Sequence, residues 1–322
     1  MLWVIIGHAT MSDVAELETA PLYEQVLYRF AYSFHMALFM FVAGYLFYFT
    51  RINPTDRRWT YLAMARNKVK RLIVPCITFS LVAFALKYAF PGAVERQVSL
   101  GWRDLVHMAL YPVDNPLREM WFIVTLMWLF LLMPLWRWAA RRPWRLMTML
   151  IALAVVNMLD VKVELLCIGN VCAHAVWFFM GVAACEYGEL LFDLKRRMRG
   201  HSTTIFASGI AVYAFGWWHE VPFIVTFGGI VLSIGLSLAA DKYLPWLFKS
   251  FRDYTYQIFL MGIFVQMAVK VVYLRLGVPH PAAYLLSIVF GLYVPVIVSK
   301  VIERIGWKPM LVCMGLKSRS SQ

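Results

Sequence analysis

Charged residues are scarce in this sequence. They occupy 15% of the 322 positions, whereas a soluble domain carries about 25%. Apolar residues reach 61%, against about 45–50% in a soluble domain. The excess is too large for an ordinary protein core. The composition therefore excludes an ordinary soluble domain and predicts a chain that is surrounded largely by lipid.

Several motifs of soluble enzymes are also missing. The sequence has no Gly-rich phosphate loop, no His-Glu-x-x-His zinc motif and no Gly-x-Ser-x-Gly nucleophile elbow. The five cysteines form no metal-type cluster, so we expect neither a bound metal nor a permanently bound cofactor. Cys167 and Cys172 lie near a predicted outer loop, where a disulfide between them is one open interpretation. The other three, Cys76, Cys185 and Cys313, are typical of apolar helix residues.

Long apolar runs divide the chain. A membrane-spanning helix needs about 20 mostly apolar residues, and nine runs meet or nearly meet this length: 33–50, 69–90, 120–138, 146–160, 171–191, 203–218, 222–240, 254–274 and 282–302. The opening Met1–Thr10 is apolar too, but ten residues reach only about 15 Å, half of the hydrocarbon core. We interpret this run as the second half of a helix that begins before Met1. The predicted fold is an all-α, polytopic transmembrane helix bundle with about ten spanning helices.

The basic residues lie in short blocks between the apolar runs. The net charge is +13, but this distribution is a topology signal rather than a nucleic-acid surface. When the 51–71 loop is placed in the cytoplasm, 23 basic residues fall in inner segments and six in outer segments. This asymmetry follows the positive-inside rule and predicts that both termini are cytoplasmic. We expect one transmembrane domain over residues 1–308 and a cytoplasmic tail over residues 309–322.

The histidines are distributed unevenly. Most often a histidine at a helix end is an interfacial residue with a water or carbonyl partner. His8 and His35 differ because they lie inside apolar runs, where ionisable groups are costly and are candidates for function. The first predicted helix runs outward and the second inward, so both imidazoles approach the outer side. Two structurally hydrogen-bonded histidines remain the alternative. Six of the seven histidines map to the outer half of the protein: His8, His35, His107, His174, His219 and His280.

A basic segment follows the second predicted helix. It reads Arg66-Asn-Lys-Val-Lys-Arg-Leu-Ile-Val-Pro75. Its cations are either topology signals that contact lipid headgroups or a binding site for phosphates, which the planar fork of Arg and the point charge of Lys both suit. Glu119, just before the 120–138 run, is either an outer acid or a helix-start residue.

Three passages resemble the acyltransferase 3 family of integral membrane acyltransferases. The first is Val4-Ile-Ile-Gly-His8 at the end of the opening helix. The second, Phe34-His-Met-Ala-Leu-Phe-Met-Phe-Val-Ala-Gly-Tyr45, is similar to the family's Phe-His-Met-Pro-Leu-Phe-Phe-Phe-x-Ser-Gly-Tyr pattern. The third, Lys68-Val-Lys-Arg-Leu-Ile-Val-Pro75, is similar to its Arg-x-x-Arg-Leu-x-x-Pro. Supporting matches begin at Met120, Phe178 and Tyr254, so the likeness covers nearly the whole chain.

The resemblance implies a function. Such proteins move an acyl group, commonly acetyl from cytoplasmic acetyl-CoA or another acyl-CoA, to hydroxyls of exported carbohydrates or other envelope molecules. By resemblance, His8 is the catalytic histidine, and Lys68 and Arg71 are the basic pair that binds the donor. Arg66 lies beside this pair, and His35 is a second catalytic candidate through its closeness to His8. The implied location is the inner (plasma) membrane, as a multi-pass protein in the lipid bilayer.

The sequence departs from the family pattern at several positions. Ala37 replaces a usual Pro, Ala43 a usual Ser, and Lys68 the first Arg of the basic pair, while Gly262 stands where many members carry His. The family's Arg about ten residues before the catalytic His would precede Met1. Two other functions stay open: a transporter or flippase of an envelope substrate, and a non-enzymatic sensor on the same fold. Paired Gly- or Pro-broken segments in two halves are typical of transporters, and the sequence shows no such symmetry.

Overall fold

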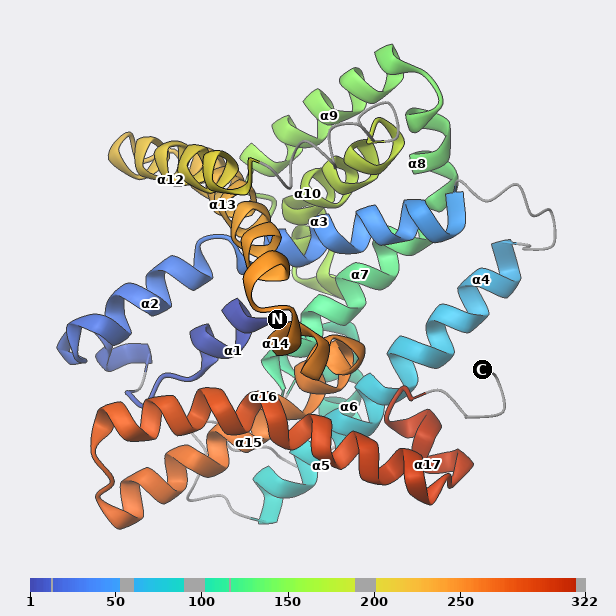
Figure 1. Ribbon diagram of the computed structural model, residues 1–322. Helices are drawn as coiled ribbons and strands as arrows, with labels where there is room; N and C mark the ends of the chain where they lie inside the picture. The colour runs from blue at the N-terminus through green and yellow to red at the C-terminus, as the bar shows by residue number, and fades with distance from the viewer. Residues whose placement is uncertain (13, 53–60, 90–101, 116, 189–200, 317–322) are drawn as a thin grey trace. The chain divides into compact units, whose positions relative to one another are not determined.

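The structure, a computed structural model, describes residues 1–12, 14–52, 61–89, 102–115, 117–188 and 201–316. Every regular element in these ranges is a helix, from α1 (Leu2–His8) to α17 (Lys308–Cys313) (Figure 1). The prediction of an all-α protein is confirmed.

Six helices in the described ranges are long and apolar enough to cross a membrane, and a seventh is counted if a helix pair with a 55° bend is one span. The bent pair joins Arg118–Leu131 to Met133–Ala140. The predicted runs at 146–160 and 203–218 correspond to shorter helices, α9 (Pro143–Met158) and α12 (Ser202–Trp218). The total of about ten spans and the cytoplasmic termini stay predictions. The six spans are Leu22–Thr50, Tyr61–Leu86, Leu165–Glu186, Pro222–Tyr243, Pro245–Leu276 and His280–Ile305.

The first full span begins earlier than the sequence predicted. The predicted run starts at residue 33, but the span extends from Leu22 to Thr50 through α2 (Leu22–Tyr32) and α3 (His35–Phe47). Glu24 and Arg29 interrupt the apolar pattern of α2, so the apolar run that the sequence shows begins only after this helix. In the structure Glu24 is fully buried and Arg29 is exposed. His35 is the first residue of α3 and follows the break at residues 33 and 34, so it lies near the middle of the Leu22–Thr50 span.

The described residues group into two compact units. Unit 1 comprises the described residues up to 39 and from 201 to 307, and unit 2 comprises the described residues from 40 to 188 and from 308 to 316. The chain passes from unit 1 to unit 2 within α3. The single transmembrane domain over residues 1–308 stays a prediction.

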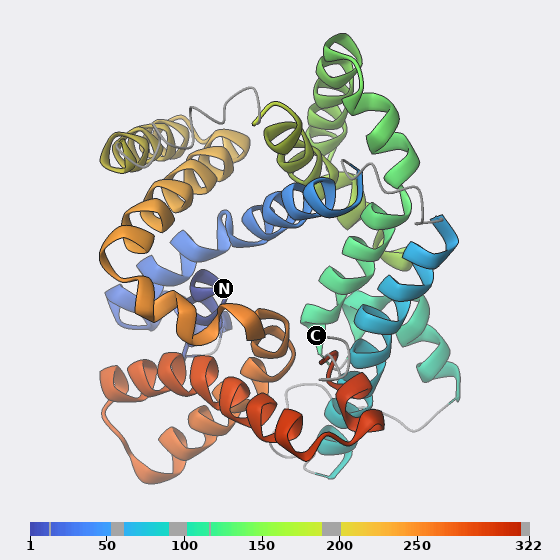
Figure 2. The same cartoon turned by 45° about the vertical axis from the view of Figure 1, so that its right-hand side comes forward.

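Glycines allow a close contact between two helices of unit 1. Helices α12 and α13 (Pro222–Tyr243) lie side by side as a hairpin (Figure 2). Gly209 and Gly216 on α12 are seven residues apart, close to two helical turns, and so are Gly228 and Gly235 on α13. A Cβ at any of these four positions would overlap the backbone of the other helix. Small residues that let backbones approach are typical of helix packing within membranes.

A second pair of glycines explains two of the resemblance motifs. In unit 2, α3 crosses α10 (Ile168–Glu186), and a Cβ at Gly44 would collide with the carbonyl of Phe178. Reciprocally, a Cβ at Gly181 would collide with the carbonyl of Phe41. The Gly of the Phe34–Tyr45 passage and the Gly of the passage at Phe178 thus form one close crossing. Their shared role is packing of the helices.

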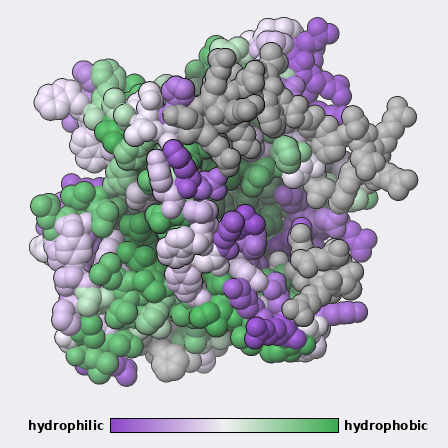
Figure 3. All heavy atoms as spheres, in the orientation of Figure 1, coloured by the Kyte–Doolittle hydropathy of each residue, from purple (hydrophilic) through white to green (hydrophobic). Residues whose placement is uncertain are grey.

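Large apolar side chains cover much of the surface. Figure 3 shows hydrophobic residues gathered over the face that α15 (Thr255–Leu276) and α16 (His280–Ile305) present. Leu276 and Leu285 on these helices are 73% and 62% exposed. A soluble monomer rarely exposes a large contiguous apolar surface, so this face suits lipid.

All five cysteines are free thiols: Cys76, Cys167, Cys172, Cys185 and Cys313. The interpretation that Cys167 and Cys172 form a disulfide is therefore wrong.

Candidate functional site

Helix α1 is short, and neighbouring helices hold its end. Its apolar residues Val4 and Ile5 are buried in unit 1, where Ile5 packs in a cluster with residues of α15 and α16. Gln266 Nε2 on α15 donates to the carbonyl of Ile5 at 2.8 Å, and the Tyr284 hydroxyl on α16 donates to the carbonyl of Ile6 at 3.2 Å. The last carbonyls of a helix lack partners within the helix. These two side chains supply partners just before His8.

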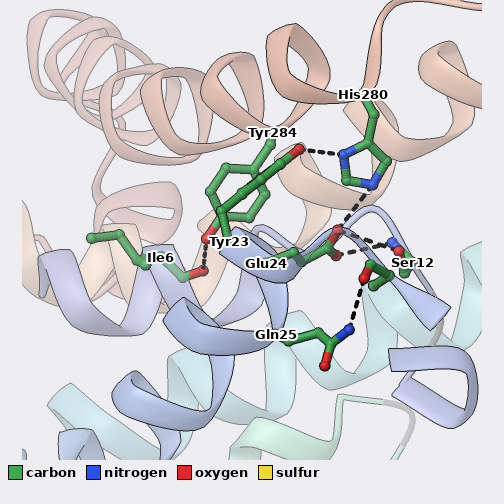
Figure 4. Close-up of polar contacts among 8 residues, drawn as sticks. Ile6, Ser12, Tyr23, Glu24, Gln25, His280 and Tyr284 are labelled. Carbon is green, nitrogen blue, oxygen red and sulfur yellow. Dashed lines mark hydrogen bonds and ion pairs between the residues drawn. The ribbon is translucent and has the colours of Figure 1, made fainter. Parts of the chain in front are cut away.

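The segment after His8 is held as well. Glu24 on α2 is fully buried, and its carboxylate accepts hydrogen bonds from the backbone N–H of Ser12 at 3.1 Å and from the Ser12 hydroxyl at 3.2 Å. His280 Nε2, at the start of α16, lies 2.9 Å from Glu24 Oε2. The second nitrogen of His280 contacts the Tyr23 hydroxyl. Figure 4 shows Glu24 between Ser12 and His280.

These contacts explain how a buried carboxylate is tolerated. Burying a carboxylate is very costly unless it is hydrogen-bonded. Glu24 accepts two hydrogen bonds from Ser12 and lies beside Nε2 of His280. The network joins α2, α16 and the segment that follows α1. Together with Gln266 and Tyr284, it fixes the chain on both sides of His8.

His35, the first residue of α3, is held in one orientation by a carbonyl of the preceding helix, α2. Its Nδ1 lies 2.8 Å from the carbonyl oxygen of Ala31, one turn earlier, and its side chain is only 2% exposed. A carbonyl oxygen only accepts hydrogen bonds, so Nδ1 carries the proton. In the neutral imidazole, Nε2 is then left with a lone pair. Nε2 of His35 can therefore accept a proton or a hydrogen bond.

The structure brings the two predicted catalytic histidines together. The ring centroids of His8 and His35 are 6.2 Å apart, and the rings are perpendicular. Tyr32 joins them: its ring lies 5.5 Å from that of His8 and 4.8 Å from that of His35. The Tyr32 hydroxyl lies 3.1 Å from His8 Nδ1. We name His8, Tyr32 and His35 the outer trio, after the predicted side of the membrane.

Helix α13 supports the break between α2 and α3. Thr226 donates a hydrogen bond to the carbonyl of Ser33 at 2.9 Å, and the Ser33 hydroxyl contacts that of Tyr213 on α12 at 3.1 Å. The ring of Phe34 packs directly on Gly229, where a Cβ would overlap it. Residues 33 and 34 are thus fixed between Tyr32 and His35.

The structure gives a reason for one departure from the family pattern. A Cβ at Gly262 would lie 3.0 Å from Ile5 Cδ1 and 3.2 Å from the carbonyl oxygen of Gly291. Helices α1, α15 and α16 therefore approach too closely for a histidine here without movement. Gln266, one turn further along α15, supplies the polar contact to α1 instead.

The predicted donor-binding residues lie in unit 2. Arg66 and Lys68 end α4 (Tyr61–Lys68), and Arg71 lies in a π-helical turn, η3 (Val69–Ile73). Single π turns inside helices frequently mark functional sites. Arg66 and Arg71 are exposed, whereas Lys68 is half-buried, with its Nζ 3.6 Å from the ring centroid of Phe130. The segment thus presents two guanidinium groups to the surroundings and places one ammonium against an aromatic ring.

The other predicted outer histidines have separate partners. His174 stacks on Trp121 at 5.4 Å in unit 2, next to η6 (Arg118–Met120), which contains Glu119. His107 pairs with Asp114 at 3.2 Å. Within the described ranges, no group of three or more His, Cys, Asp or Glu side chains is arranged to hold a metal ion.

Sequence reasoning missed Tyr32 and Glu24. Both belong to α2, which the charge of Glu24 and Arg29 had removed from the predicted span. The available signal was the helical spacing of Glu24, Tyr28 and Tyr32, each four residues apart, since residues at this spacing share one helix face.

A family model for an acyltransferase domain matches residues 1–300. The chain belongs to the acyltransferase 3 family. It is therefore an acyltransferase, and its apolar helices make it a multi-pass membrane protein with an acyl donor and an acyl acceptor as reaction partners. No curated protein and no solved structure matches the chain.

Proposed function

We propose that this acyltransferase moves an acetyl group from acetyl-CoA, or another acyl group from its CoA thioester, to a hydroxyl of an envelope or exported carbohydrate. It acts in the inner (plasma) membrane with both termini in the cytoplasm. The family supplies the reaction type. The donor, the acceptor and the location are the proposal.

The outer trio is the observation that carries the proposal. Two imidazoles and a phenol lie together within one unit, although the chain has only seven histidines. Acyl transfer to a hydroxyl needs a group that accepts the hydroxyl proton, and histidine is the side chain most often used for this. We assign this role to His8. His35, with Nδ1 committed to Ala31, orients the acceptor or His8 through its second nitrogen.

The reaction transfers one acyl group and one proton. The acceptor oxygen loses its proton toward His8 and forms a bond to the acyl carbon. The bond between the acyl carbon and the sulfur of the donor breaks, and the departing thiolate takes the proton. A site with little water limits hydrolysis of the thioester, and the apolar surroundings of α1 suit this requirement.

Arg66, Lys68 and Arg71 are proposed to bind the phosphates of the CoA donor. Arg presents a planar fork that matches phosphate oxygens, and charge-assisted hydrogen bonds are about twice as strong as neutral ones. The exposure of Arg66 and Arg71 supports this role. Because Lys68 contacts the ring of Phe130, we assign it the role of stabilising the turn, and we assign donor binding to the two arginines.

Acetyl-CoA consumption by the purified protein in nanodiscs tests the proposal. The acceptors offered are a panel of methyl glycosides and envelope sugars, with product detected by mass spectrometry. We expect thiol release that depends on a sugar acceptor, together with an O-acetylated product. Release of no thiol with acetyl-CoA and longer acyl-CoA donors, across the whole panel, would contradict the proposed donor and acceptor classes.

A further inference from the structure

Tyr32 is the most accessible member of the outer trio. It is 39% exposed, whereas His35 is 2% exposed and His8 is half-buried. Its hydroxyl contacts Nδ1 of His8, and its ring makes T-shaped contacts with the imidazole rings of both histidines. A molecule that approaches Nδ1 of His8 therefore meets the Tyr32 hydroxyl.

The packing around Tyr32 holds its hydroxyl at this position. Gly7, the residue before His8, leaves room for the ring, since a Cβ there would lie 3.1 Å from Tyr32 Cε2. Tyr28, one turn earlier on α2, stacks on the same ring with centroids 4.1 Å apart and planes 25° apart. The packing of the Tyr32 ring thus explains the glycine before His8, because Gly7 lets this ring reach His8.

We propose that Tyr32 is a catalytic residue that passes the proton of the acceptor hydroxyl to His8. This inference rests on the proposed role of His8 as the base. The acceptor O–H bond breaks and its proton moves to the Tyr32 oxygen, while the Tyr32 proton moves to Nδ1 of His8. The acceptor oxygen bonds to the acyl carbon as the bond to the donor sulfur breaks. His8 then returns its proton to the departing thiolate, so both side chains end as they began.

The rival role for Tyr32 is orientation alone. If Nδ1 of His8 donates to the Tyr32 oxygen, Nε2 is the base and the phenol only fixes the imidazole tautomer. The two roles differ in the number of protons that move in the transition state. A relay through Tyr32 moves two protons, whereas direct transfer to Nε2 moves one.

Tyr32→Phe in the full chain tests the relay, with Tyr28→Phe as the matched control. Each change removes one phenol oxygen and keeps the ring, on the same helix and within the same stacked pair. The reaction is single-turnover acyl transfer in nanodiscs from acetyl-CoA to a methyl glycoside, with thermal unfolding followed in parallel. We expect Tyr32→Phe to lower the rate about 10²–10⁴-fold, the usual effect of losing an acid–base group. Tyr28→Phe should keep most of the rate.

The proton inventory of the wild-type protein gives a second readout that a structural role would not produce. Rates are measured in mixtures of H₂O and D₂O. Two protons in flight give a curved dependence on the deuterium fraction, which we expect, and this measurement decides the question even if Tyr32→Phe unfolds. A linear dependence, or a folded Tyr32→Phe protein with the wild-type rate, would overturn the relay.

The same set of variants separates this inference from the function on which it rests. Loss of activity in His8→Ala with a retained rate in Tyr32→Phe leaves His8 as the base and refutes only the relay. A retained rate in His8→Ala refutes the proposed base itself, and the relay with it.

Discussion

Replacement of Gln266 by Met tests whether contacts remote from the reaction hold His8 in place. The substitution keeps the length and nearly the volume of the side chain but removes the amide that donates to the Ile5 carbonyl at 2.8 Å. Gln266 is 3% exposed, so water does not readily replace the lost bond. The Ile5 carbonyl, near the end of a seven-residue helix, loses the donor that α15 supplies.

The expected loss of stability is modest. A buried polar group left without its partner costs about 1–3 kcal/mol. Hydrogen bonds between helices in membranes contribute only about 0.6 kcal/mol on average, and about 1.7 kcal/mol at most. We therefore expect the free energy of unfolding to fall by about 1–2 kcal/mol. The rate of acyl transfer should also fall, because the lost bond lets His8 move, and a displacement of a catalytic group by about 1 Å costs about 10²-fold in rate.

Ser299→Ala is the matched control for Gln266→Met. Ser299 on α16 is also fully buried, but its hydroxyl donates to the Pro295 carbonyl within the same helix. Ser299→Ala therefore removes a buried hydrogen bond within α16 and leaves the hydrogen bond from Gln266 to α1 in place. We measure acyl transfer and thermal unfolding of both variants in nanodiscs, and expect only Gln266→Met to lose about tenfold or more in rate. Equal rates for Gln266→Met and the wild-type protein would refute the positioning of His8 through α15.

Three further predictions concern packing, donor binding and topology. Gly181→Leu should lower the unfolding temperature sharply because any Cβ there meets the α3 backbone, whereas Ala152→Leu on an exposed position of α9 should not; equal unfolding temperatures would contradict the crossing. Arg71→Ala should weaken binding of a non-reactive acetyl-CoA analogue about tenfold, since a charge-assisted contact contributes about 1.5–3 kcal/mol, and an unchanged affinity would leave Arg71 a topology signal. Reporter fusions after residues 140 and 318 should read cytoplasmic, and those after 163 and 279 external; one consistently inverted pair would remove a helix from the predicted map.

The sequence predicted the helical class and the closeness of His8 and His35 from simple rules. Apolar length identified the spans, because the requirement of about 20 apolar residues is set by the bilayer and not by tertiary contacts. The alternation of helix direction then brought His8 and His35 to the same side. The structure places their rings 6.2 Å apart.

The remainder of the site depends on contacts that no local pattern records. Glu24 broke the apolar pattern of α2, and only its partners Ser12 and His280 explain why it is buried. With α2 taken as a loop, Tyr32 had no predicted place in a helix. Gln266 is a single amide in an apolar run, and its partner lies at the opposite end of the chain. These residues become interpretable only when α1, α2, α15 and α16 are seen together.

The activity of His8→Ala tests the proposed role of His8 as the base most directly. Acylation of the envelope carbohydrate is measured in cells that lack the native gene, with the membrane abundance and thermal unfolding of the variant measured in parallel. Loss of a general base typically costs about 10²–10⁴-fold in rate, or about 3–5 kcal/mol in the barrier. We expect His8→Ala to insert at the wild-type level, to unfold at the wild-type temperature and to give no detectable acylation. Near-normal acylation by His8→Ala would contradict this role.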